Sequence, residues 1–118
     1  MDYNSAAKMC QAEHANAFLI AYINSSHSEE VVNKDRTSHT KLWIAPVESP
    51  STPGKFVLPG FFECVAKSIP WYADEPSVGE PCTELYVNEN LVNACPCNNF
   101  ENRVICQIPN FPYQEFCE

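Results

Sequence analysis

The stretch from Trp71 to Cys106 gathers the residue types in this chain that are most able to do chemistry. It holds four of the seven cysteines, and its acidic turn Glu75-Pro76-Ser77 is followed by Glu80 and, further along, by Asn93. Calcium is bound in proteins by carboxylate and amide oxygens, and a site needs several of them together. Disulfide bonds could hold two loops and two short strands of this stretch around such a cluster. We interpret the upstream chain as the scaffold that positions it.

The overall composition sets bounds on the class of protein. A chain of 118 residues is expected to form one domain, residues 1–118, that buries roughly two-thirds of its unfolded surface. No apolar run reaches the 18 residues of a membrane span. The net charge of −8 argues against nucleic acid and against anionic membranes as partners, and is compatible with cation binding. An acidic soluble surface explains the same charge without any site.

Seven cysteines in a chain of this length are typical of a disulfide-stabilised extracellular protein. The first residues, MDYNSAAK, lack the basic and apolar regions of a signal peptide. We therefore expect a secreted protein whose signal peptide is absent from this chain. A cytosolic zinc protein is the competing interpretation.

The order of the expected elements indicates an α+β fold. A helix that runs into a strand is predicted over Asn4–Ile23, with Asn4 or Ser5 as its cap, and a second helix over Ser28–Arg36. A long loop is expected from Phe61 to Gly79. Short strands are predicted at Lys41–Ala45, Lys55–Leu58, Leu85–Val87, Leu91–Val92 and Arg103–Ile108.

Several motifs, in order along the chain, resemble those of the C-type lectin-like domain in its short form, as in secreted invertebrate C-type lectins. They are Ala6-Ala7-Lys8-Met9-Cys10, Ala17–Ile23 followed by Ser28-Glu29-Glu30, Leu42-Trp43-Ile44-Ala45, Lys55–Gly60, Pro70-Trp71 through Glu75-Pro76-Ser77, Val92–Cys97, and Val104-Ile105-Cys106-Gln107. Together they cover nearly the whole chain.

The resemblance implies a fold of two helices, small mixed antiparallel sheets and a long loop region, stapled by disulfides. It implies the pairs Cys10–Cys106 and Cys82–Cys97. Three further cysteines are additional to the family pattern. Of these, Cys64 could pair with Cys95, and Cys117 would be left unpaired or available for an intermolecular bond that makes a homodimer. The resemblance also makes Glu75-Pro76 a candidate for a cis peptide bond. Because Pro46 follows Ala45, the strand there is expected to end early.

The resemblance further implies that a carbohydrate or glycoprotein is bound through a calcium ion. The ligand positions carried over are Glu75, Ser77, Glu80, Asn93 and Ala94, the last through its backbone oxygen alone. The sugar would contact Glu75, Ser77, Glu80 and Asn93, with Trp71 or Tyr72 covering an apolar face of the ring.

Two departures from the family pattern favour a second hypothesis. Ser77 stands where an amide is usual, and Ala94 stands where a carboxylate is usual. The alternative is a calcium-independent module of the same fold that binds protein and whose calcium site is degraded. Trp43 and Phe18 are expected in the core under either hypothesis.

Other chemistry has little support in the sequence. Cys95-Pro96-Cys97 could be part of a zinc site, but no second pair stands at a regular interval. Glu75 and Glu80 could face each other as in a glycoside hydrolase, but no other feature supports hydrolysis. We therefore do not expect an enzyme.

Overall fold

One helix and eight short strands make up the described part of this computed structural model, which covers residues 1–15, 17–21, 41–59, 64–66, 69–77, 79–99, 101–108 and 117. Their bounds are α1 Tyr3–Glu13, β1 Phe18–Leu19, β2 Lys41–Ile44, β3 Val47–Glu48, β4 Phe56–Leu58, β5 Cys64–Val65, β6 Cys82–Tyr86, β7 Leu91–Cys95 and β8 Cys106–Gln107.

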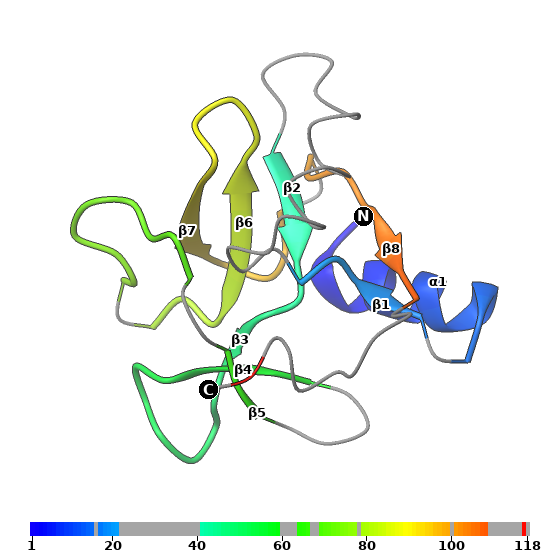
Figure 1. Ribbon diagram of the computed structural model, residues 1–118, viewed down its shortest axis with the longest axis horizontal. Helices are drawn as coiled ribbons and strands as arrows, with labels where there is room; N and C mark the ends of the chain where they lie inside the picture. Colours follow the sequence, from blue (N-terminus) through cyan, green and yellow to red (C-terminus); the bar gives the residue numbers. More distant parts are fainter. Residues whose placement is uncertain are drawn as a thin grey trace.

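The strands form three small antiparallel sheets, in the orders β1-β8, β2-β6-β7 and β3-β4-β5. The first pairs the two ends of the chain, with Phe18 opposite Gln107 and Leu19 opposite Cys106. In Figure 1, β1 and β8 lie beside α1, and β3-β4-β5 lies at another end of the molecule, close to the C-terminus. The β6–β7 hairpin, which carries the predicted site residues Asn93 and Ala94, is joined to the rest of its sheet by the pairing of β6 with β2.

The first helix begins at Tyr3 because Asp2 caps it. The carboxylate of Asp2 accepts a hydrogen bond of 2.8 Å from the backbone N–H of Ser5, which satisfies one of the donors left open in the first turn. The predicted caps, Asn4 and Ser5, were wrong by two to three residues, because Asp2 offers the carboxylate at the position where the chain is still extended. The helix buries Tyr3, Ala6 and Cys10.

The sheet β2-β6-β7 is covered on both faces. Side chains alternate between faces along each strand, so the register determines which residues share a face. Trp43, Cys82 and Cys95 pack with the helix residues in one hydrophobic cluster. Leu85 and Val92 belong to a second cluster, which the half-buried Trp71 contacts. Strands buried on both faces explain the apolar run at Leu42–Ala45.

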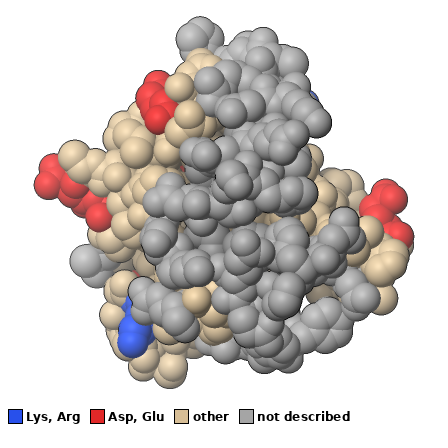
Figure 2. Space-filling model, in the orientation of Figure 1, with Lys and Arg blue, Asp and Glu red and all other residues tan. Residues whose placement is uncertain are grey.

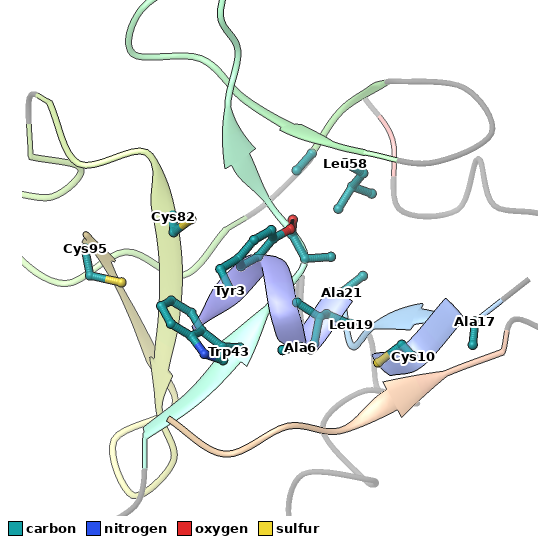
Figure 3. Close-up of a cluster of buried hydrophobic side chains, with 12 residues drawn as sticks. Tyr3, Ala6, Cys10, Ala17, Leu19, Ala21, Trp43, Leu58, Cys82 and Cys95 are labelled. Atoms are coloured by element: carbon teal, nitrogen blue, oxygen red, sulfur yellow. Dashed lines mark hydrogen bonds between the residues drawn. The ribbon is translucent and has the colours of Figure 1, made fainter. Parts of the chain in front are cut away.

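Aromatic side chains fix the N-terminus to this sheet. The ring of Tyr3 meets the edge of the fully buried Trp43 ring, with 5.7 Å between centroids, and its hydroxyl donates to the carbonyl of Ala45 at 2.8 Å. The indole N–H of Trp43 donates to the carbonyl of Met1 at 3.0 Å. Figure 3 shows these side chains between the helix and the sheet. The placement of Trp43 in the core is confirmed.

Most of the predicted elements are found: the strands predicted at Leu85–Val87 and Leu91–Val92 appear as the longer β6 and β7, and others are shorter than predicted. The strands over Lys41–Ala45, Lys55–Leu58 and Arg103–Ile108 appear as β2, β4 and β8, and β2 ends before Pro46 as expected. The second helix predicted over Ser28–Arg36 lies outside the described residues, so the described part has one helix where the resemblance implied two. None of the described helical residues forms a segment long and apolar enough to span a membrane.

Candidate functional site

The acidic turn is attached to β7 through its backbone. The N–H of Tyr72 donates to the carbonyl of Val92 at 2.9 Å, and the N–H of Val92 donates to the carbonyl of Pro70 at 2.8 Å. The N–H of Glu75 donates back to the carbonyl of Tyr72 at 3.1 Å, closing the turn. The Glu75-Pro76 peptide bond is cis, as the resemblance implied. These bonds place Glu75 next to the strand that holds Asn93 and Ala94.

Both carboxylate oxygens of Glu75 accept hydrogen bonds from the protein itself. Oε1 accepts from the backbone N–H groups of Ala94 at 2.9 Å and Ser77 at 3.1 Å, and Oε2 accepts from the Ser77 hydroxyl at 2.6 Å. Partial burial raises the pKa of Glu75, but the bonds from Ser77 and Ala94 outweigh it and hold the pKa below its ordinary value. The ionised carboxylate therefore fastens the loop to β7.

Asn93 and Ala94 are consecutive in β7, so their side chains leave opposite faces of the strand. The amide of Asn93 donates to Oε2 of Glu84 at 2.9 Å, across the ladder on which these two residues are register partners. Ala94 is only 1% exposed and offers Glu75 its backbone N–H. Glu75 therefore contacts the free edge of β7 through a backbone group, while the side chain of Asn93 is held by Glu84.

Glu84 is a polar feature that the sequence interpretation missed. It is 3% exposed, and its carboxylate accepts from three side-chain amides: Asn93 on Oε2, and Asn99 at 3.3 Å and Asn102 at 3.1 Å on Oε1. These amide donors satisfy the hydrogen-bonding capacity of the buried carboxylate. One of them, Asn93, is the register partner of Glu84 on β7. The available signal was an acidic residue inside the strand Cys82–Tyr86, followed by a cluster of asparagines after Cys97.

In this arrangement the carried-over residues offer few free carboxylate oxygens to a calcium ion. Calcium requires about 6–8 oxygen ligands, several of them charged. The oxygens of Glu75 are already engaged, Ala94 has no side-chain oxygen, and Asn93 turns to Glu84. Glu80 is half-buried and makes no hydrogen bond within the described segments. Nor do His, Cys, Asp and Glu side chains gather in threes suitable for a metal anywhere in the described ranges. On the face drawn in Figure 2, the acidic side chains lie in separate places.

Trp71 is half-buried, and one edge of its ring system is packed. Its centroid lies 4.9 Å from that of Phe56 at an interplanar angle of 65°, and its backbone bridges to Val92. The neighbouring Tyr72 packs edge-on against Tyr86, with 5.0 Å between centroids. Trp71 is thus both a packing residue of the loop and a partly accessible aromatic surface.

The disulfide map confirms two predicted pairs and corrects the rest. Cys10–Cys106 and Cys82–Cys97 are present. The pairing of Cys64 with Cys95 and the unpaired state of Cys117 were wrong. Cys64 pairs with Cys117, because a β-bridge between Ala66 and Cys117 places Cys117 beside β5 and leaves 5.6 Å between the two Cα atoms. With Cys117 bonded inside the chain, it no longer supports a covalent homodimer.

Cys95 is the free cysteine, and it is buried. It is the register partner of Cys82, and its sulfur lies on the side of the sheet that faces Tyr3 and Trp43 (Figure 3). Burial, and then the negative charges of Glu84 and Glu80, raise the pKa of the thiol. A thiolate is the reactive form of cysteine, so both access and ionisation are suppressed.

We accordingly expect Cys95 to resist iodoacetamide in the folded protein and to take up one carbamidomethyl group in denaturant without reductant. Mass spectrometry of the intact chain and of its peptides measures both results. Rapid labelling of the folded protein would contradict the buried placement. A label on Cys64 or Cys117 would contradict the disulfide map.

Comparisons with protein-family models and with curated proteins found no match. Comparison with solved structures gives similar folds over almost the whole chain. TC14, a C-type lectin from the tunicate Polyandrocarpa misakiensis, matches with a TM-score of 0.70 and 20% identity, over 90% of this chain and 88% of that one. This chain has the C-type lectin fold.

Two further structures with this C-type lectin fold illustrate the range of the likeness. CEL-I from Cucumaria echinata matches with a TM-score of 0.75 and 15% identity, over 92% of this chain and 85% of its own. The mouse scavenger receptor C-type lectin carbohydrate-recognition domain matches with a TM-score of 0.70 and 18% identity. The match covers 92% of this chain and 84% of that domain. The resemblance seen in the sequence is confirmed at the level of the fold.

Proposed function

We propose that this protein is a binding module that recognises a glycan or glycoprotein without calcium. The observation that carries the proposal is the engagement of the Glu75 carboxylate by Ser77 and by the backbone N–H of Ala94. The function is inferred to be binding and not catalysis. Three disulfides in 118 residues favour an extracellular location.

The hydrogen bonds of Glu75 oppose calcium binding energetically. An ion at this carboxylate would displace donors that now satisfy it, and two of those donors are backbone N–H groups with few other partners. Hydrogen bonds to charged groups each contribute about 1.5–3 kcal/mol, so their loss would offset much of the gain from one added cation. Ala94 supplies no second carboxylate as compensation.

A glycan is the proposed partner because similar folds belong to proteins described as lectins and as a carbohydrate-recognition domain. The loop next to β7 also offers the partly accessible Trp71. Aromatic side chains of this kind present a flat apolar surface with a polar edge, which suits a ligand that is apolar on one face and hydroxylated around its rim.

The proposal is tested by measuring binding to a glycan panel in calcium and then in excess EDTA. We expect the same ligands and the same apparent affinities in both conditions, since no bound ion contributes to the contact. Loss of binding in EDTA, restored by added calcium, would overturn the proposal and favour the calcium-dependent lectin.

A further inference from the structure

An open pocket with a volume of about 350 Å³ lies between the sheet β3-β4-β5 and the loop that carries the acidic turn. Its lining includes Lys55, Phe56, Val65, Ile69, Trp71 and Pro76. This volume lies in the range of small-molecule sites. Glu75, Ser77, Glu80 and Asn93, the residues predicted to bind sugar, are not among the described residues that line it. The pocket is therefore distinct from the predicted calcium site.

One wall of the pocket is aromatic and already formed. Trp71 is held by a hydrogen bond of 2.9 Å from its N–H to the carbonyl of Ile69 and by its bridge to Val92. Phe56, only 4% exposed, supports the indole ring from the side. A ligand that packs on this wall does not have to order it first, which lowers the entropic cost of binding.

The rim of the pocket carries a positive charge. Lys55 is exposed, and its backbone is fixed by bonds to Thr52 and Ser49. Its ammonium group makes no hydrogen bond or ion pair within the described segments. In a chain of net charge −8, a cation beside an apolar pocket that has no acidic partner among the described residues favours a ligand that bears a negative group.

We propose that this pocket binds a sugar ring that carries a carboxylate, such as a uronic acid unit within a glycan. The apolar face of the ring packs on Trp71, and the carboxylate meets the ammonium of Lys55. This assignment rests on the proposed function, since it names the class of glycan and a place for it. It does not involve Glu75 or a metal ion.

The test is a fluorescence titration in EDTA with methyl β-D-glucuronide, and with methyl β-D-glucoside as the matched ligand that lacks the carboxylate. The chain has two tryptophans, and Trp43 is 0% exposed, so a ligand-dependent change reports on Trp71. We expect a saturable change with the glucuronide at millimolar concentration. The glucoside should bind at least about tenfold more weakly, since one charge-assisted hydrogen bond is absent.

Two variants separate the pocket from general charge effects. Lys55→Gln should weaken glucuronide binding to the level of the glucoside, whereas Lys8→Gln, exposed on α1, should leave it unchanged. Equal binding by Lys55→Gln, or no saturable change with the glucuronide either in EDTA or in millimolar calcium, would overturn the pocket assignment and leave calcium independence standing. Glucuronide binding that requires calcium but is lost in Lys55→Gln would overturn the proposed function and support the pocket.

Discussion

Replacing Glu84 with alanine is expected to lower the free energy of unfolding by about 3 kcal/mol or more. The substitution removes the common acceptor of the amides of Asn93, Asn99 and Asn102, and two of these three residues are half-buried and one is buried. Leaving a buried donor unsatisfied costs about 1–3 kcal/mol, and three amides lose this acceptor, of which Asn99 keeps its bond of 3.2 Å to Oδ1 of Asn102. At about 4 °C per kcal/mol in a domain of this size, the unfolding midpoint should fall by roughly 12 °C.

Urea denaturation of the wild type and the variant measures this difference directly. Glu89→Ala is the matched control, because Glu89 is exposed in the turn of the same β6–β7 hairpin, and it should change stability by less than about 0.5 kcal/mol. The loss of stability in Glu84→Gln should lie between those of Glu84→Ala and Glu89→Ala, since glutamine keeps one acceptor oxygen. A loss below about 1 kcal/mol for Glu84→Ala would show that the carboxylate is not the centre of this amide cluster.

The second large effect is expected from the disulfide between α1 and β8. Cys10 and Cys106 are 96 residues apart, and chain entropy gives about 4.7 kcal/mol for a closed loop of roughly 100 residues. The double variant Cys10→Ala, Cys106→Ala should therefore lose more stability than Cys82→Ala, Cys97→Ala. The latter closes a separation of 15 residues, which gives about 3 kcal/mol.

Thermal and urea unfolding of the two double variants, beside the wild type, checks this order. The prediction also holds if the variant Cys10→Ala, Cys106→Ala folds only at low temperature. Without the disulfide, β8 is held to β1 by a pairing of only two residues. A greater loss in the variant that lacks Cys82–Cys97 would contradict it.

Much of the fold could be predicted from the sequence because its elements carry strong local signals. The apolar run at Leu42–Ala45, the turn residues before β4 and the ordered motifs along the chain all predicted strands that the structure contains. The cap of α1 was misplaced because Asp2 stands close to Asn4 and Ser5, which also favour a cap, and propensity alone does not choose between them.

The partner of a cysteine and the environment of a carboxylate depend on contacts between distant segments. Cys117 meets Cys64 because it forms a β-bridge with Ala66, a contact over 53 residues that spacing does not reveal. Glu84 appears in the sequence as one acid in a short strand, and only the assembled structure brings Asn99 and Asn102 to it. Likewise, side chains alternate between the two faces along β7. Asn93 and Ala94, which are neighbours in the carried-over ligand set, therefore point to opposite faces.

The most direct test of calcium independence is thermal unfolding of the wild-type protein in millimolar calcium and in EDTA. A ligand at about 100 times its dissociation constant would stabilise the fold by roughly 2.7 kcal/mol, which would raise the midpoint by several degrees. We predict the same midpoint in both solutions, because Glu75 is already satisfied by Ser77 and Ala94. A midpoint several degrees higher in calcium would contradict this account and restore the calcium site at Glu75, Ser77, Glu80 and Asn93.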